Sequence, residues 1–260
     1  MKKQKNNPTL AIISLTCCEG CQQTILDLGP RLLDLLKLVD LREFDWTEDE
    51  PEPDIMFDLT LIEGSVVSKY DLARLEKIRK KSKKLIAIGA CACLGGIPEI
   101  KNYSDKGQAI KYVYKNIKNI DNLEIKPLRK YVKIDFEIPG CPPDKDEVFE
   151  ILKQIIMGRI PAIPKRPVCY ECALQNNDCF LLAKKICLGP ISLGGCKAVC
   201  PSNAYRCEGC RGPIEVQKNK NNKIIPSENT INLLKKLRKL SSQEEIQSLL
   251  EKFGMKDDIL

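Results

Sequence analysis

Cysteine is the residue type in this chain with the most chemistry to offer. The 260 residues include fourteen cysteines and no histidine. Without an imidazole, mixed cysteine-histidine zinc fingers and catalytic triads or dyads that use histidine are excluded. Apolar residues make up 43% of the chain, enough for a core that needs no disulfides. No apolar run is long enough for a transmembrane helix or a signal peptide, so we expect a cytoplasmic protein whose reduced thiols can bind metal.

The N-terminal cysteines occur in three groups that are far apart in the sequence. The groups are Cys17, Cys18 and Cys21, then Cys91 and Cys93, then Cys141. Each group follows a predicted strand, and ligands of open α/β sheets bind outside the carboxyl ends of the strands. Four thiolates that converge at such an edge satisfy a 4Fe-4S cluster. The competing interpretation is that these are inert buried cysteines.

The other eight cysteines form two sets with regular spacing. They run Cys169-x2-Cys172-x6-Cys179-x7-Cys187 and then Cys196-x3-Cys200-x6-Cys207-x2-Cys210. Each set contains a CxxC pair, which places two thiolates on one turn. Two 4Fe-4S clusters and two zinc sites with four cysteines each both fit this spacing. Zinc has no redox chemistry, so the zinc interpretation makes this region a structural or interaction module.

The elements that position the first three groups alternate between apolar runs and helix-like stretches. This alternation predicts a flavodoxin-like α/β fold, a largely parallel sheet with helices on both faces. The predicted strands are Leu10–Leu15, Ile55–Ile62, Leu85–Ile88 and Tyr131–Ile138, and the predicted helices are Gln22–Val39, Lys69–Lys81, Lys106–Ile117 and Lys145–Met157. Gly29 and Pro30 interrupt the first helix, which predicts a kink or a restart with Pro30 in the first turn.

The chain divides where its composition changes. Three prolines in residues 159–167 (RIPAIPKRP) suit an extended connector. We therefore predict an α/β domain over residues 1–160, a small cysteine-rich iron-sulfur domain over 161–215 and a helical tail over 216–260.

The C-terminal tail contains a polar run followed by a predicted amphipathic helix. Residues 217–223 (QKNKNNK) predict an exposed loop. In the last helix, Ser242 and Glu245 predict a capping box, and Gly254 predicts the end. An apolar stripe on this helix should pack on the body of the protein or on a partner, and it consists of Ile246, Leu249, Leu250 and Phe253. The net charge of +7 comes from interspersed charges, which favours a solvated surface over nucleic-acid binding.

Several segments, in this order, resemble those of one known family. They are LTCCEGCQ (15–22), LIEGSV (61–66), GACACLGGIPE (89–99), IPGCPPD (138–144), CLGPISLGGCKAVCPS (187–202) and CEGCRGP (207–213). Over nearly its whole length the chain resembles the small, electron-transfer subunit of nickel-iron hydrogenases. The resemblance is closest to cytoplasmic members, and among them to the delta subunit of sulfhydrogenases.

The resemblance implies three 4Fe-4S clusters with full cysteine ligation. The implied ligands are Cys18, Cys21, Cys91 and Cys141 for the proximal cluster, Cys196, Cys200, Cys207 and Cys210 for the medial cluster, and Cys169, Cys172, Cys179 and Cys187 for the distal cluster. Periplasmic members have histidine in place of Cys169 and proline in place of Cys200, so the departure here implies the cytoplasmic type.

The implied role is electron transfer without bond-breaking chemistry. Electrons would pass between a nickel-iron site on a separate large subunit and a further partner, either an NAD(P)-binding flavoprotein, with sulfur reduction as a related activity, or an iron-sulfur protein. Small subunits that feed heterodisulfide reductase or a deazaflavin coenzyme are also similar, so the acceptor stays open. The related quinone-reducing subunit of complex I is a weaker match, since it lacks an equivalent of Cys21 and the eight-cysteine extension.

Three residues near these motifs have no settled role. Cys17 is adjacent to Cys18, and in the complex I subunit adjacent cysteines both ligate, but here we interpret Cys17 as a spare thiol. Cys93 has no partner in the family pattern and is expected to pack in the core. Glu63 matches an acidic position of the family near the proximal cluster, where it would either position groups or move protons, or only brace a loop.

Overall fold

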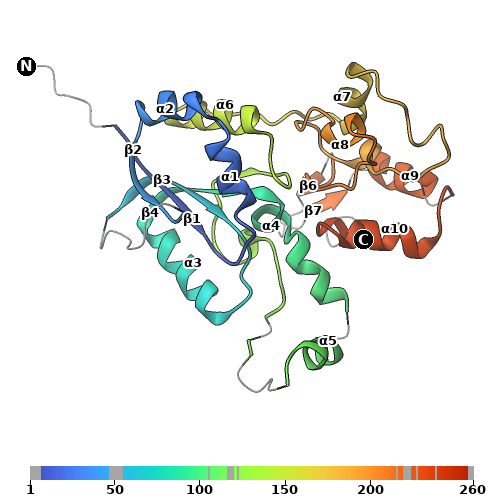
Figure 1. Ribbon diagram of the computed structural model, residues 1–260, viewed down its shortest axis with the longest axis horizontal. Coiled ribbons are helices and arrows are strands. Elements are labelled where there is room, and N and C mark those ends of the chain that lie inside the picture. Colours follow the sequence, from blue (N-terminus) through green and yellow to red (C-terminus); the bar gives the residue numbers. More distant parts are fainter. Residues whose placement is uncertain are drawn as a thin grey trace, which may run out of the picture.

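The fold is built around one parallel sheet (Figure 1). The computed structural model describes residues 7–46, 55–104, 106–115, 120–121, 123–214, 216–218, 224–226, 228–237 and 239–256. In spatial order the strands are β2 (Asp40–Phe44), β1 (Thr9–Ser14), β3 (Phe57–Glu63), β4 (Ser82–Ile88) and β5 (Phe136–Ile138). All neighbouring pairs are parallel, and the order 2-1-3-4-5 is the flavodoxin-like one. The predicted fold class is confirmed.

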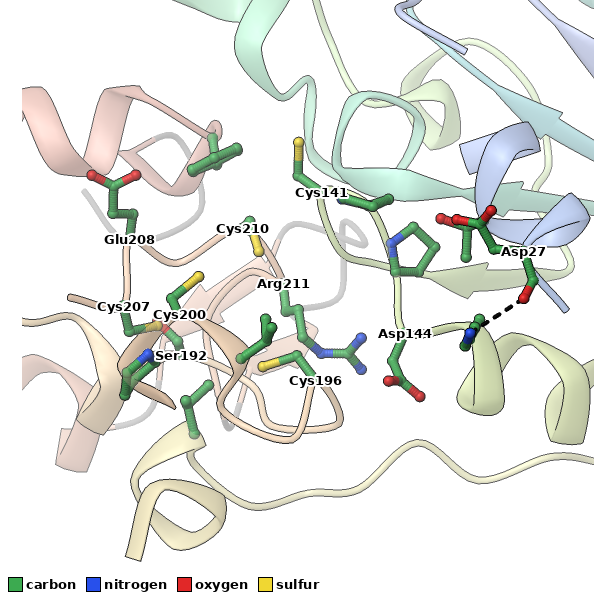
Figure 2. A pocket seen from close by; sticks show the side chains of 18 residues that line it. Asp27, Cys141, Asp144, Ser192, Cys196, Cys200, Cys207, Glu208, Cys210 and Arg211 are labelled. Atoms are coloured by element: carbon green, nitrogen blue, oxygen red, sulfur yellow. Dashed lines mark hydrogen bonds between the residues drawn. The ribbon is translucent and has the colours of Figure 1, made fainter. Parts of the chain in front are cut away.

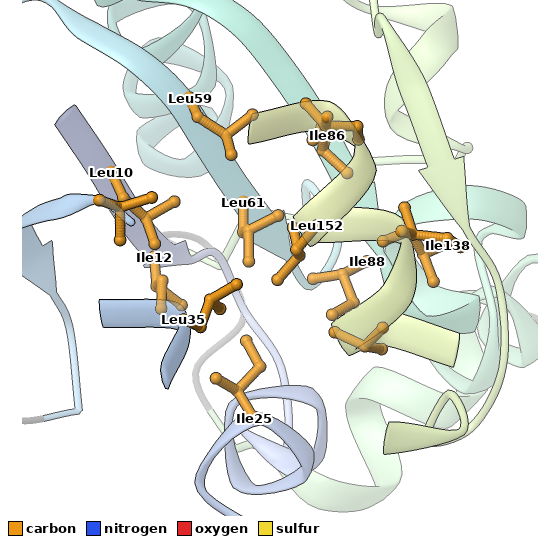
Figure 3. Close-up of a cluster of buried hydrophobic side chains, with 14 of the residues drawn as sticks. Leu10, Ile12, Ile25, Leu35, Leu59, Leu61, Ile86, Ile88, Ile138 and Leu152 are labelled. Atoms are coloured by element: carbon orange, nitrogen blue, oxygen red, sulfur yellow. The ribbon is translucent and has the colours of Figure 1, made fainter. Parts of the chain in front are cut away.

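Alternate residues of the central strands enter two separate cores. Leu10, Ile12, Leu61 and Ile88 face the helices α1, α2 and α6, where Leu152 packs against them (Figure 3). The helices on this face are α1 (Gly20–Leu26), α2 (Pro30–Leu36) and α6 (Lys145–Ile156).

The opposite face is covered by α3 (Lys69–Lys81) and the short α4 (Gly89–Leu94). Here Ile13 and Ile62 pack with Leu75 of α3. Because the strands are buried on both faces, they read in the sequence as continuous apolar runs.

Local sequence signals account for most helix ends. α3 has the predicted bounds and begins with a capping box between Ser68 and Asp71. Pro30 is in the first turn of α2, as expected for a restarted helix. Asp144 accepts a hydrogen bond from the amide of Glu147 and so caps α6.

Other predictions of strands and helices need correction. The helix predicted over Gln22–Val39 is the two helices α1 and α2. The strand predicted over Tyr131–Ile138 is only β5, because a 3-10 helix, η2 (Leu128–Lys130), precedes it. The helix predicted over Lys106–Ile117 is α5 (Lys106–Val113), and residues 116–119 lie outside the described part.

The second half of the chain contains short elements. These are α7 (Val168–Leu174), η3 (Gly189–Ile191), α8 (Val199–Ser202), the antiparallel pair β6 (Val216–Lys218) and β7 (Ile224–Pro226), α9 (Glu228–Leu237) and α10 (Gln243–Glu251). The loop predicted for residues 217–223 was wrong at its start, since Gln217 and Lys218 belong to β6, and residues 219–223 lie outside the described part.

The tail helices pack against the cysteine-containing segment. Leu234 of α9 and Leu250 of α10 share a buried cluster with Leu188 and Ile191. The apolar stripe of the last helix therefore packs on the body, as predicted. Half of the predicted capping box forms: Ser242 accepts a hydrogen bond from the amide of Glu245, whose carboxylate instead pairs with Arg206 at 2.6 Å.

The segment boundaries at about residues 160 and 215 stay a prediction. Among the described residues, none of the helices has the length and hydrophobicity needed to span a bilayer.

Candidate cysteine sites

The first candidate site lies at the carboxyl edge of the sheet. Cys18 follows β1, Cys21 is in the first turn of α1, Cys91 is in α4 directly after β4, and Cys141 follows β5. Backbone hydrogen bonds tie these loops together. The amide of Ala90 donates to the carbonyl of Gly140 at 2.7 Å, next to Cys91 and Cys141. The parallel topology thus brings three distant segments of the chain to one place.

The thiols at this edge are close enough to influence one another. Burial, and then repulsion from Cys141 and Cys18, raises the pKa of Cys91 to about 12. Burial and then repulsion from Cys18 also raise the pKa of Cys141. For Cys21, burial is again the largest cause of a raised pKa, with Cys91 among the contributors. Thiols that repel each other as thiolates suit a shared metal centre, which keeps coordinating thiols deprotonated.

Gly89 provides space for Cys21. Its φ is +89°, and a Cβ added there would overlap the Cys21 sulfur. Any other residue at this position would be strained and would also displace the thiol. The backbone at the end of β4 is therefore shaped to admit a cysteine side chain from α1.

Glu63, at the end of β3, contacts this site through the backbone of Cys21. It is 2% exposed. Its Oε2 accepts a hydrogen bond from the amide of Cys21 at 3.2 Å, while Oε1 has no hydrogen-bond partner in the described part of the chain. The bracing role left open by the sequence therefore has a contact that supports it.

Cys17 and Cys93 have different surroundings from the other thiols. Cys93, a residue of α4, is 1% exposed and packs into the core of the sheet, as expected. Cys17 accepts a hydrogen bond from the amide of Glu19 at 3.4 Å. Burial, with Glu63 as the next cause, raises the pKa of Cys17 to about 12. Cys18 is among the causes that raise the pKa of Cys91 and Cys141.

The second candidate site is a cavity of about 490 Å³ between the two halves of the chain (Figure 2). Four of its lining residues are the predicted medial cysteines, namely Cys196, Cys200, Cys207 and Cys210. Cys141 of the first site lines the same cavity. The two sites are thus immediate neighbours.

The third candidate site gathers the remaining four cysteines around α7 and η3. Burial and then repulsion from Cys187, Cys172 and Cys179 raise the pKa of Cys169 to about 12. A Cβ added at Gly189 would lie 3.1 Å from the Cys169 sulfur and 3.6 Å from the Cys187 sulfur. The sulfurs of Cys169 and Cys187 thus lie on the same side of Gly189.

Backbone amides point at several of these sulfurs. The amide of Cys207 donates to the Cys187 sulfur at 3.3 Å, so the second and third sites are linked as well. Such N–H···S bonds stabilise electron-rich sulfur and set the potential of an iron-sulfur cluster. In the described ranges, no three cysteine or carboxylate side chains stand close enough to hold a single metal ion.

Two buried charged groups near the second site were not predicted from the sequence. Glu171, between Cys169 and Cys172, is 5% exposed and accepts a hydrogen bond from the amide of Gly195 at 2.7 Å. Arg211, directly after Cys210, is 2% exposed and pairs with Glu147 of α6. No local pattern indicates either contact, although Arg211 lies within the CEGCRGP segment.

Known proteins with similar sequences identify the family. The sequence model of the family described as NADH ubiquinone oxidoreductase, 20 Kd subunit, matches residues 18–155. The sulfhydrogenase 2 subunit delta of Pyrococcus furiosus is 42% identical over 206 residues, which are 78% of this chain and 86% of that protein. The chain belongs to this family and, within it, to the hydrogenase small subunits. The predicted resemblance is confirmed.

Further relatives show how far this hydrogenase small-subunit similarity extends. A subunit of the F420-non-reducing hydrogenase of Methanocaldococcus jannaschii is 32% identical, over 79% of this chain and 82% of that protein. Among solved structures, a subunit of an NAD+-reducing [NiFe]-hydrogenase matches with a TM-score of 0.56 and 27% identity, over 61% of this chain and 96% of its own. The actinobacterial-type hydrogenase of Ralstonia eutropha H16 shares the fold over 93% of this chain and 91% of its own, with a TM-score of 0.57 and 16% identity.

Proposed function

We propose that this chain is the electron-transfer small subunit of a cytoplasmic nickel-iron hydrogenase and that it holds three 4Fe-4S clusters. The proposed ligands are Cys18, Cys21, Cys91 and Cys141 for the proximal cluster, Cys196, Cys200, Cys207 and Cys210 for the medial cluster, and Cys169, Cys172, Cys179 and Cys187 for the distal cluster.

The observation that carries the proposal is the convergence of thiols from distant loops beside a cysteine-lined cavity. Cys18, Cys91 and Cys141 come together because the strands before them, β1, β4 and β5, are parallel members of one sheet and end at the same edge. Cys141 also lines the cavity of the second set, and Cys207 donates to a sulfur of the third. Three adjoining thiol sites in a row are what a relay of electrons requires.

The clusters, when bound, would supply one-electron redox chemistry. The chain itself contributes ligation, burial and hydrogen bonds to sulfur. Cys187 of the proposed distal site and Cys207 of the proposed medial site are each 8% exposed, so the protein shields these two thiols from water. Lower polarity and amide donors around the sulfurs are the features by which a protein tunes a cluster.

The first site supports a partner on the sheet edge. Cys18 and Cys141 are exposed in the isolated chain. A cluster left exposed there would lose electrons to oxidants in solution, so we propose that the large subunit with the nickel-iron centre covers this edge. Such a permanent interface buries roughly 2,000 Å² or more.

For the further partner, we propose an NAD(P)-binding flavoprotein. The basis is the 27% identity to a subunit of an NAD+-reducing [NiFe]-hydrogenase, together with the higher identity to the Pyrococcus furiosus sulfhydrogenase subunit, 42%, than to the F420-non-reducing hydrogenase subunit, 32%. A partner of the heterodisulfide reductase type is the alternative, and co-purification distinguishes the two.

Anaerobic purification of the tagged chain from its own host tests the proposal. We expect a nickel-containing large subunit to co-purify, together with a flavoprotein that reduces NAD(P) when dihydrogen is supplied. A complex without nickel, or a preparation without dihydrogen-dependent reduction of any acceptor, would contradict the hydrogenase role.

The tandem cysteines provide a matched pair of variants for the ligand assignment. Cys18→Ser should remove about four irons per chain, because a 4Fe-4S cluster needs all four thiolates. Cys17→Ser changes the same loop and should keep the wild-type iron content. If Cys17→Ser also loses a cluster, the adjacent cysteines are both ligands and the assignment is wrong.

A further inference from the structure

One buried side chain connects the loops of the first and second sites. Arg211 donates from Nη1 and Nη2 to the two carboxylate oxygens of Glu147, at 2.7 and 2.8 Å. Nη1 also donates to the carbonyl of Pro139 at 2.6 Å, and Nε donates to the carbonyl of Gly194 at 2.8 Å. Figure 2 shows Arg211 extending from the segment of Cys210 toward that of Asp144.

Both backbone carbonyls that Arg211 binds lie close to a proposed ligand. Pro139 is two residues before Cys141, and Gly194 is two residues before Cys196. Arg211 itself follows Cys210. One guanidinium therefore fixes the backbone near one ligand of the first site and two ligands of the second.

The chemistry of this pair requires arginine. A buried charge is tolerated only when it is paired and its remaining donors are satisfied. The planar fork of a guanidinium binds a carboxylate with two parallel hydrogen bonds and has donors left for carbonyls, whereas an ammonium acts as a point charge. The fit is tight, because a Cβ added at Gly195 would overlap both Arg211 and Glu147.

The loops held in this way meet at one cavity, because Cys141 and Cys210 both line the cavity of the second site. The two cysteines are far apart in the sequence, and the strands of the sheet fix only the loop of Cys141. The clamp of Arg211 and Glu147 ties the segment of Cys210 to that loop.

We propose that Arg211, with Glu147 as its counterion, is a positioning residue that sets the distance between the proximal and medial sites. It does so by holding the loop of Cys141 and the segment of Cys210 at a fixed separation across the cavity that both line. This inference rests on the proposed function, since it assigns a role to the junction of two sites that the proposed function gives to clusters.

The test compares Arg211→Lys with Arg206→Lys in the full complex. Both residues stand next to proposed medial ligands, but Arg206 is a partly exposed residue paired with Glu245. The readouts are iron content, electron spin resonance of the reduced clusters and the rate of electron exchange between them. Arg211→Lys should keep its iron, change the magnetic interaction between the proximal and medial signals and slow the exchange about tenfold, or about 1.36 kcal/mol in the barrier.

Arg206→Lys should match the wild type in all three readouts. Glu147→Gln should reproduce the Arg211→Lys spectrum, because it breaks the same pair from the other side. If Arg211→Lys does not assemble, the spectrum and exchange rate of Glu147→Gln test the positioning role in its place. Wild-type spectra and exchange in Arg211→Lys or Glu147→Gln would overturn the positioning role alone. Wild-type protein without iron-sulfur signals would overturn the proposed function, and the positioning role with it.

Discussion

The sheet region and the cysteine-rich segment position their cysteines, the proposed cluster ligands, in two different ways. In the sheet region, Cys18, Cys91 and Cys141 are brought together by strand order, and two large apolar clusters hold the strands. In the cysteine-rich segment the ligands are close in sequence. The small buried cluster beside them contains Val168, Ala198 and two of the cysteines themselves.

This difference shows that hydrophobic burial positions one site and that local spacing positions the others. A region with little apolar core needs another source of stability, and bound metal commonly provides it. The sheet should therefore fold without clusters, while residues 168–214 should depend on them and on the tail helices that pack over Leu188 and Ile191.

The largest expected effect comes from removing a buried ligand of the cysteine-rich segment. Cys207→Ala should lose about four irons per chain. It should also expose the amides of residues 168–214 to hydrogen exchange, while those of β1, β3 and β4 stay protected. Cys93→Ala removes a buried thiol from the sheet core and should keep all its iron. Protection throughout the segment in Cys207→Ala would show that it does not depend on metal.

A core substitution in the sheet should destabilise the sheet and leave the iron content unchanged. Leu61 is fully buried in the core under α6, so Leu61→Ala should lower the free energy of unfolding of the sheet by about 2–5 kcal/mol. The iron content of folded protein should not change. Leu182→Ala, at a side chain that is 86% exposed in the other region, should change stability by less than about 0.5 kcal/mol. Amide hydrogen exchange in each region over a denaturant series measures both, and similar losses in the two variants would contradict the comparison.

The packing of the tail helix α10 on α4 of the sheet region can be tested at Gly254, just after α10. Its φ is +75°, and a Cβ there would overlap the carbonyl of Leu94 in α4. Gly158 has the same backbone conformation, with φ +74°, but open space around it. Gly158→Ala should cost about 1–2 kcal/mol from backbone strain alone.

Gly254→Ala carries the same strain and a clash, so it should cost more than Gly158→Ala in the free energy of unfolding. It should also raise hydrogen exchange in α10. Equal costs for the two variants would mean that α10 does not pack tightly on α4.

The smallest effect is expected from the surface ion pair of Asp146 in α6 with Lys197 of the cysteine-rich segment. Hydrogen bonds from Lys197 and then Arg31 lower the pKa of Asp146. Because the folded pKa is below the unfolded value of 3.8, the pair stabilises the protein above that pH and loses its effect as the pH falls through the folded pKa.

Asp146→Asn should therefore lower the free energy of unfolding at neutral pH, and the difference should vanish in acid. The side chain is 42% exposed, so salt screening keeps the loss below about 1 kcal/mol. Asp34→Asn removes an equal charge from a more exposed pair with Lys37 and should have less effect. Unfolding over a pH series checks both, and a difference that grows in acid would contradict the assigned sign.

Much of the sheet and the first site was predictable because strong local signals determine them. Apolar runs marked β1, β3 and β4, and topology then required the cysteines after them to converge. β2 was missed because it is a short edge strand whose sequence, DLREF, contains only two apolar residues. With one face of an edge strand partly solvated, no continuous apolar run marks it.

The clamp at Arg211 was beyond prediction for a different reason. Its partner Glu147 is 64 residues away, and neither residue has a local pattern that requires the other. The choice of Cys18 rather than Cys17 as a ligand stays a prediction, because adjacent thiols differ only in what the fold places around them. Contacts made by packing thus decide what local sequence signals leave open.

The most direct test of the central claim is the metal and sulfide content of protein purified without oxygen. Three 4Fe-4S clusters predict about twelve irons and twelve acid-labile sulfides per chain. Colourless protein with about two zinc ions and no sulfide would contradict the claim, and it would make the cysteine-rich segment a structural zinc module.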